Sequence, residues 1–220
     1  MLKAIIFDMD GVLIDSTKYV WEANRILLEK EGVKFSEQDI KKWLGMSLRD
    51  QLKIWSKYFG IRELDLNDYS RKSFDIQMKL MREKEKPNKD LINLIKNAKE
   101  DSVKLAVATS SSKYRAEKIL DMLGITNFFD VIIAADDVPN HKPNPDLFLE
   151  AARRINVKPE ECAVIEDAEN GVEAAKRGNI KVVALLTPYH TKEELKEADL
   201  IINDFSELSI GKLKNLINTK

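Results

Sequence analysis

The sequence has few of the features that mark disulfide-bonded or nucleic-acid-binding proteins. It contains a single cysteine, Cys162, so no disulfide can form within the chain. Cys162 lies in the apolar run "CAVIE", and we interpret it as a small buried side chain rather than a nucleophile. Lys and Arg together number 36 against 37 Asp and Glu, and no block of basic residues stands out. This balance argues against nucleic acid as a partner.

Long apolar segments are also missing. No apolar run approaches the roughly 20 residues that a membrane-spanning helix needs. The N-terminal stretch "MLKAIIFD" has neither the apolar core nor the small-residue cleavage site of a secretory signal. We therefore expect no membrane association and a cytoplasmic location. The 220 residues are enough for one large domain, or for a core domain with a smaller insertion.

Short apolar runs alternate with segments of helical period along most of the chain. The runs are residues 3–7, 103–108, 131–134, 162–166, 180–185 and 199–203. The helical segments are residues 89–100, 113–123, 145–156, 169–177 and 206–217. Strands that alternate with helices are typical of a parallel sheet covered on both faces. The predicted fold class is therefore α/β, with a Rossmann-like, doubly wound parallel sheet.

Residues 16–86 interrupt this alternation. They contain no strand-like run, and their apolar residues recur at three- and four-residue spacing. We predict an inserted α-helical cap domain over 16–86 and a catalytic core domain made of residues 1–15 and 87–220. The three tryptophans of the cap domain are expected to lie in its own core rather than against a substrate. They are Trp21, Trp43 and Trp55.

Acidic, hydroxyl and basic side chains follow several of the predicted strands. In a parallel sheet of this kind, ligands bind outside the carboxyl ends of the strands. The residues delivered there are Asp8, Asp10, Thr109, Ser110, Lys142, Glu166 and Asp167. Each alone has an ordinary structural explanation, as a helix cap, a turn or a solvated loop residue. Their joint occurrence at strand ends favours a functional site.

Four short motifs carry these residues: "DMDGVLIDS", "ATSSS", "HKPNPD" and "IEDAENG". In this order and spacing they resemble the four motifs of the haloacid dehalogenase superfamily. The helical insertion after the first motif is similar to that of superfamily members with a helical cap. Within the superfamily, the chain looks closest to the group of phosphatases and β-phosphoglucomutases. The resemblance implies a hydrolase that acts on phosphate monoesters.

The resemblance also implies a role for each motif residue. Asp8 would be the nucleophile that forms an aspartyl-phosphate, which splits one difficult step into two. Asp10 would protonate the leaving oxygen and then deprotonate the attacking water. The Thr109 hydroxyl and the Ser110 backbone N–H would hold the phosphoryl oxygens. Lys142 would bridge Asp8 and the phosphoryl group as a compact positive charge.

A Mg²⁺ ion is implied as the cofactor, because it prefers oxygen ligands and keeps several waters. By resemblance, its protein ligands would be the Asp8 and Asp167 carboxylates and the Asp10 carbonyl. Glu166 would be either a further metal ligand or a neighbour of the ligands. Two like charges at positions 8 and 10 are expected to help raise one carboxyl pKa. Their spacing of two would place both on one face of a regular strand.

The type of reaction depends on a few further positions. Asp10 argues against dehalogenation and phosphonate hydrolysis, since superfamily members with those activities lack this second aspartate. Arg49 matches an arginine that holds the distal phosphate of a β-phosphoglucomutase substrate. Two positions depart from that mutase, because Val20 replaces an expected histidine and Leu44 an expected lysine. These departures favour hydrolysis over the mutase.

We therefore expect a Mg²⁺-dependent phosphatase of a small phosphorylated metabolite, such as a sugar phosphate or phosphoglycolate. The alternatives are a sugar-phosphate mutase and, from another class, a catalytically silent binding protein on the same fold. We interpret Ser111 and Ser112, the last two residues of the second motif, as structural residues.

Overall fold

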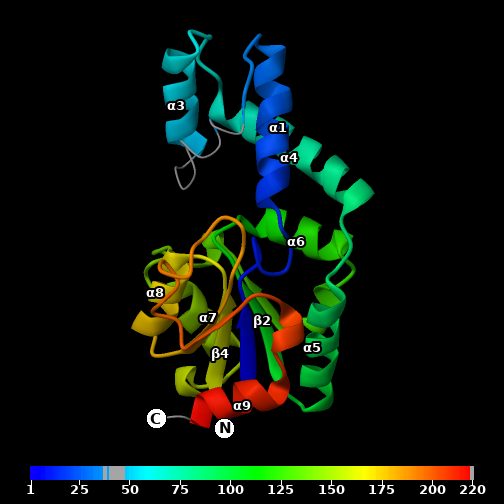
Figure 1. Cartoon of the computed structure of the whole chain (residues 1–220), viewed down its shortest axis with the longest axis vertical. Helices are drawn as coiled ribbons and strands as arrows, with labels where there is room; N and C mark the ends of the chain where they lie inside the picture. The colour runs from blue at the N-terminus through cyan, green and yellow to red at the C-terminus, as the bar shows by residue number, and fades with distance from the viewer. Residues whose placement is uncertain (37–38, 40–47, 219–220) are drawn as a thin grey trace. The chain divides into compact units, whose positions relative to one another are not determined.

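The computed structural model describes residues 1–36, 39 and 48–218 (Figure 1). The chain folds into two compact units, Met1–Asp15 with Lys86–Lys220, and Ser16–Glu85. The boundary at Glu85 lies one residue from the expected domain boundary.

The first unit is built on a parallel sheet with the strand order β3-β2-β1-β4-β5-β6. The strands are β1 (Ala4–Phe7), β2 (Lys104–Ala108), β3 (Val131–Ile133), β4 (Cys162–Glu166), β5 (Lys181–Leu185) and β6 (Leu200–Ile202). All neighbours pair in parallel, as expected from the apolar runs. The strand order reverses direction at β1, which leaves a topological switch point between β1 and β4. The doubly wound, Rossmann-like sheet is therefore confirmed.

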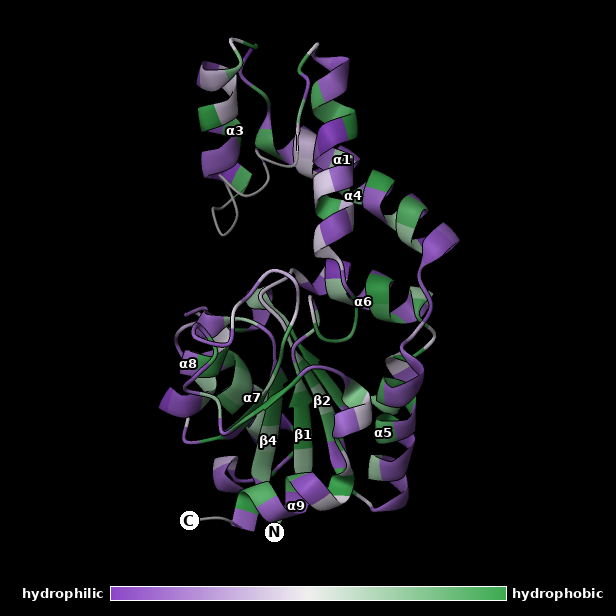
Figure 2. Cartoon of the chain, in the orientation of Figure 1, coloured by the Kyte–Doolittle hydropathy of each residue, from purple (hydrophilic) through white to green (hydrophobic). Residues whose placement is uncertain are grey.

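Helices cover both faces of this sheet. They are α5 (Lys89–Glu100), α6 (Lys113–Met122), α7 (Asp146–Arg154), α8 (Glu169–Arg177) and α9 (Ile210–Asn218). Helices α7 and α8 pack in one apolar cluster with alternate strand residues such as Ala4 and Ile6. Helix α5 contacts β2, and helix α9 contacts β4 (Figure 1). Figure 2 shows apolar strands between helices that carry polar residues along their outer sides.

The central strand β1 is buried on both sides. Ala4, Ile5, Ile6 and Phe7 are all fully inaccessible to solvent. Because side chains alternate along a strand, Ile5 and Phe7 face away from α7, and the Phe7 ring meets Phe129 edge-on at 5.9 Å. Full burial of each large side chain contributes about 1.5–3 kcal/mol to stability. This anchored strand fixes the position of the acidic residues that follow it.

The last predicted helix is shorter than expected. Residues 206–217 were predicted as one helix, but Phe205–Glu207 forms a separate 3-10 turn, and α9 begins at Ile210. The Asp204 side chain accepts a hydrogen bond from the Ser206 backbone N–H, which stabilises the turn. Local capping thus overrides the helical period at this point.

Cys162 is fully buried at the start of β4, as expected. Burial raises the pKa of its thiol to about 12. A thiol of this kind stays protonated at neutral pH and is inert as a nucleophile.

The second unit is helical in its described part. It contains α1 (Thr17–Lys30), α3 (Leu48–Tyr58) and α4 (Leu66–Lys84). Phe35 stacks on Trp21 at 6.0 Å and meets Trp55 edge-on at 5.4 Å, and all three side chains are buried. The core positions of Trp21 and Trp55 are therefore confirmed, whereas Trp43 lies outside the described residues. None of the described helices is both long and apolar enough to cross a membrane.

Candidate functional site

The register of the sheet brings the ends of three strands together. Phe7 pairs with Val107 of β2 and with Ile165 of β4, so the next residue, Asp8, lies level with Ala108 and Glu166. The Asp8 backbone N–H continues the ladder by donating to the Ile165 carbonyl at 2.9 Å. Thr109 and Asp167, one residue further along, follow the two neighbouring strands at the same edge.

Lys142 joins two of these strand ends. Its Nζ donates to Oδ1 of Asp8 and, at 2.7 Å, to Oε1 of Glu166. The ammonium also lies 4.8 Å from the centre of the Phe148 ring of α7, and only 3% of the side chain is exposed. The loop after β3 therefore brings a buried cation to the carboxylates, as the sequence predicted.

Glu166 is held on both of its oxygens. Oε1 accepts from Lys142, and Oε2 accepts from the backbone N–H groups of Asp167 at 2.6 Å and Ala168 at 2.8 Å. A Cβ at Gly171 would lie 1.8 Å from Oε1, so the first turn of α8 fits around this carboxylate only with glycine there. Of the two roles expected for Glu166, this arrangement favours that of a neighbour that positions Lys142.

Asp167 packs against the turn that follows β1. A Cβ at Gly11 would lie 2.0 Å from Oδ2 of Asp167, and Gly11 has a φ of +90°, which side-chain-bearing residues rarely adopt. The Thr187 hydroxyl approaches the same Oδ2 at 3.5 Å from the loop after β5. The Asp10–Gly11 turn and the end of β4 are thus matched in shape, with the Asp167 carboxylate between them.

Asp10 is placed differently from the expectation. Strand β1 ends at Phe7, so the alternation of a regular strand does not extend to Asp10. Its Oδ2 instead accepts from the Ser111 hydroxyl at 2.7 Å, and its Oδ1 accepts from Nη2 of Arg115 at 3.1 Å. The expectation that Ser111 is structural did not include this contact with a candidate catalytic carboxylate. Arg115 was not predicted at all.

The second motif presents a buried hydroxyl beside an exposed residue. Thr109 is 1% exposed, and its Oγ1 accepts from the Ser111 backbone N–H at 3.0 Å. Ser110 is exposed at the turn that leads into α6. Ser112 accepts from the Arg115 backbone N–H and caps α6, so its structural interpretation is confirmed. The phosphate-binding roles of Thr109 and Ser110 remain predictions.

Burial and like charge raise the pKa of two carboxyl groups here. Burial, opposed by Lys142 and assisted by Glu166, raises the pKa of Asp8 to about 7. Burial, together with Glu166 and Asp8, raises the pKa of Asp167 to about 8. Burial alone would lower the pKa of Lys142, but Asp8 and Glu166 raise it above its usual value. Asp10 makes the smallest of these contributions to Asp8, so its like charge is a minor effect.

The donor set fits a small divalent cation. Asp8 and Glu166 share the Lys142 ammonium, and the buried carboxyl group of Asp167 lies at the same sheet edge. Because the pKa values of Asp8 and Asp167 are raised, a further positive charge beside them would stabilise their ionised forms. Within residues 1–36, 39 and 48–218, no three Asp, Glu, His or Cys side chains are grouped closely enough to ligate a metal by themselves. Mg²⁺ does not require such a group, because it is usually bound by one or two carboxylates and several waters. Asp8 and Asp167 supply that number.

Arg49 belongs to the helical unit. It is exposed at the second position of α3, and its expected role in substrate binding stays a prediction. Val20 lies half-buried in α1, and Leu44 lies outside the described residues.

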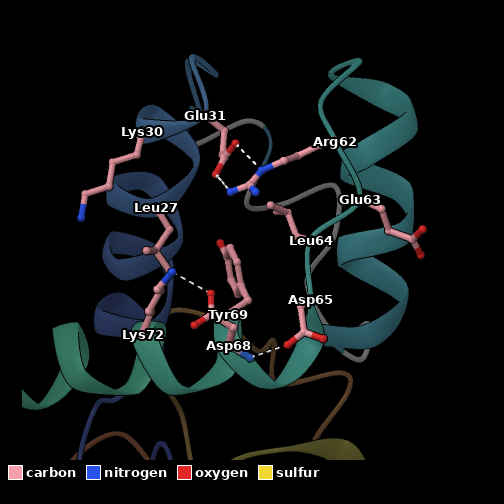
Figure 3. Close-up of a pocket in the computed structure, with 10 residues that line it drawn as sticks. All are labelled: Leu27, Lys30, Glu31, Arg62, Glu63, Leu64, Asp65, Asp68, Tyr69 and Lys72. Atoms are coloured by element: carbon pink, nitrogen blue, oxygen red, sulfur yellow. Dashed lines mark hydrogen bonds and ion pairs between the residues drawn. The ribbon is translucent and has the colours of Figure 1, made fainter.

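A separate pocket of about 250 Å³ lies within the helical unit (Figure 3). Its charged side chains are largely paired among themselves. Arg62 binds Glu31 at 2.8 Å, and Lys72 binds Asp68 at 2.6 Å beside the ring of Tyr69. None of the residues that the sequence singled out for catalysis lines it.

The chain is similar to known proteins over most of its length. Residues 5–185 match the model of the family described as haloacid dehalogenase-like hydrolase. A phosphorylated carbohydrates phosphatase from Thermotoga maritima is 33% identical over 82% of this chain and 83% of its own length. The β-phosphoglucomutase of Bacillus subtilis is 31% identical over 95% of this chain and 92% of its own length.

The fold is shared with solved structures. The crystal structure of CbbY from Rhodobacter sphaeroides in complex with phosphate matches with a TM-score of 0.85. It is 28% identical and covers 97% of this chain and 100% of its own. The motifs, the sheet and these matches together show that the chain belongs to the family of haloacid dehalogenase-like hydrolases.

Proposed function

We propose that this protein is a phosphatase that hydrolyses a small phosphate monoester, of the sugar-phosphate type, with Mg²⁺ as its cofactor. The observation that carries the proposal is the buried contact of Lys142 with both Asp8 and Glu166. This contact lies at the edge of the sheet where Asp167 follows β4. The chain's relatives include a phosphatase of phosphorylated carbohydrates, which supports this substrate class over phosphoglycolate. The first unit would be the catalytic core and the second the cap that supplies specificity.

In this proposal, Asp8 attacks the phosphorus atom and becomes phosphorylated. The Asp8 backbone N–H donates to the Ile165 carbonyl, and its Oδ1 accepts from Lys142. These two contacts hold the buried carboxylate in one orientation, which favours in-line attack. Lys142 offsets the negative charge that gathers as the anionic substrate approaches Asp8. Glu166 keeps that ammonium in place through Oε1.

Asp10 is the proposed acid and base. It would donate a proton to the leaving oxygen in the first step and remove one from water in the second. Its side chain is 31% exposed, in contrast to buried Asp8, and so remains open to a leaving group. The Thr109 hydroxyl and the Ser110 backbone N–H would hold the phosphoryl oxygens at the start of α6.

Asp8, Asp167 and the Asp10 carbonyl would hold the Mg²⁺ ion. When bound, the ion would neutralise phosphoryl charge and orient the transferred group. The close fit between Gly11 and Asp167 keeps one of these carboxylates against the turn that bears Asp10.

A phosphate-release screen tests the proposal. Purified protein would be incubated with Mg²⁺ and a panel of sugar phosphates, phosphoglycolate and nitrophenyl phosphate. Release of inorganic phosphate that stops with EDTA supports a metal-dependent phosphatase. If no monoester is cleaved, the alternative of a catalytically silent binding protein is favoured.

The second candidate function is a β-phosphoglucomutase-like mutase. It is favoured by the similarity to the mutase of Bacillus subtilis along nearly the whole chain. Val20 and Leu44 depart from the mutase residues, which supports hydrolysis. Incubation with β-glucose 1-phosphate separates the two, because a mutase yields glucose 6-phosphate and a phosphatase yields glucose and free phosphate.

A further inference from the structure

Asp10 is part of a closed ring of hydrogen bonds with two residues of the α6 region. Ser111 Oγ donates to Oδ2 of Asp10 at 2.7 Å, and Arg115 Nη2 donates to Oδ1 at 3.1 Å. The ring closes through Nε of Arg115, which donates to Ser111 Oγ at 3.2 Å. Each carboxylate oxygen is thus held by a different donor, and the hydroxyl is itself oriented by the guanidinium.

The position of Arg115 is not explained by the stability of its helix. It lies in the first turn of α6, where the helix dipole disfavours a cation, and that turn contains no acidic residue to offset it. Its side chain is only 17% exposed, far less than that of a solvated helix arginine such as Arg153 at 67%. The guanidinium fork, rather than the helix, accounts for the arginine, because it can donate to Asp10 and Ser111 at once.

We propose that Arg115, acting with Ser111, is a positioning residue that fixes the Asp10 carboxyl group for proton transfer to the leaving oxygen and from the attacking water. This inference rests on the proposed function, in which Asp10 serves the leaving oxygen. Proton transfer needs a donor within hydrogen-bond reach of that oxygen. Asp10 lies beyond the end of β1, where an isolated bridge to Ile14 holds its backbone but does not orient its side chain. The ring of hydrogen bonds provides the orientation that the sheet does not.

The kinetic test compares two leaving groups. In Arg115→Ala, kcat/KM for an alkyl phosphate such as a sugar phosphate should fall about 10- to 100-fold, because this ratio reports the phosphorylation of Asp8, in which the poor leaving group needs the proton. The kcat/KM for nitrophenyl phosphate should change less than about threefold. Arg115→Lys should restore part of the alkyl phosphate rate, because one ammonium can reach Asp10 without the full fork. Arg154→Ala, which removes an exposed arginine paired with Glu150 on α7, is the matched control.

Other outcomes would overturn the proposal. Equal loss of kcat/KM on both substrates, or a fall in melting temperature with no change in kcat or kcat/KM, indicates a structural arginine. A rise in KM for every substrate with kcat unchanged indicates that Arg115 binds the substrate anion directly.

A crystal structure of Arg115→Ala tests the arrangement without reference to activity. We expect the Asp10 side chain to adopt a different rotamer or to become disordered. An Asp10 carboxylate that keeps its position would overturn the proposal. If the wild-type protein cleaves no monoester, the proposed function fails, and the Asp10 conformation in this variant still decides whether Arg115 positions it.

Discussion

Lys142 and Glu166 form a buried ion pair, with Nζ 2.7 Å from Oε1 and neither side chain more than 3% exposed. The two residues come from different segments, a loop after β3 and the end of β4, and they meet beside Asp8. A charge in such surroundings is tolerated only while it is paired. The pair therefore links the stability of the first unit to the arrangement of its candidate site.

Removal of Lys142 should destabilise the protein. In Lys142→Ala, the Asp8 and Glu166 carboxylates remain buried without their cation, and the free energy of unfolding measured in EDTA should fall by about 3–5 kcal/mol. Lys196→Ala removes an exposed pair with Glu193 and should cost less than about 1 kcal/mol. Urea denaturation of the two variants gives the comparison, and an equal, small cost in both would show that Lys142 is not needed to offset the buried acids.

Gly11→Ala should weaken metal binding more than it weakens the fold. The new Cβ would lie 2.0 Å from Oδ2 of Asp167 and must displace that carboxylate. Gly60 has a similar positive φ of +65° but open space around it, so Gly60→Ala reports the backbone strain alone. We expect Mg²⁺ to raise the melting temperature of wild-type protein and of Gly60→Ala, and to have a smaller effect on Gly11→Ala. Equal Mg²⁺ shifts in both variants would argue against Asp167 as a ligand.

Asp10→Asn should affect poor leaving groups most. Without its proton, kcat/KM for an alkyl phosphate, which reports the phosphorylation of Asp8, should fall about 100-fold or more, whereas kcat/KM for nitrophenyl phosphate, whose leaving group needs little protonation, should be largely retained. Steady-state kinetics on the two substrates measures the difference. The same fractional loss on both would contradict the role of Asp10 as an acid.

Asp199 should contribute to stability only above acidic pH. Burial tends to raise its pKa, but the Val182 backbone N–H and the ammonium groups of Lys176 and Lys181 lower it below its usual value. Because the pKa is lower in the folded protein, the contribution is present above the unfolded pKa of about 3.9 and is lost as the pH falls through the folded value. Asp199→Asn should therefore be less stable than wild type at pH 7, by about 1 kcal/mol, and nearly equal to it near pH 2. A stability difference that does not change with pH would contradict this.

The sequence predicted the sheet and the main residues of the site because both depend on strong local patterns. Apolar runs of β1 and β4 marked strands buried on both faces, and the polar residues after them had to meet at one sheet edge. Ser111 and Arg115 were missed because their partner, Asp10, lies about 100 residues away and no local pattern links them. Ser111 precedes Ser112, the N-cap of α6, so the helical period does not connect it with Arg115 either.

The role of Glu166 could not be predicted for a similar reason. The direction of its carboxylate depends on the backbone N–H groups of Asp167 and Ala168, which donate to Oε2. These N–H groups point toward Glu166 because the chain turns there into α8. The strand order and the helix positions follow from periodicity, whereas the direction of each carboxylate depends on contacts between distant segments.

The most direct test of the account is the rate of phosphate release by Asp8→Asn in the presence of Mg²⁺. The substitution keeps the shape of the side chain and removes the nucleophilic charge, so the folded variant should release phosphate at least about 1,000-fold more slowly than wild type. Circular dichroism and the melting temperature would establish that the variant is folded. A folded Asp8→Asn variant with a substantial fraction of the wild-type rate would contradict covalent catalysis at Asp8.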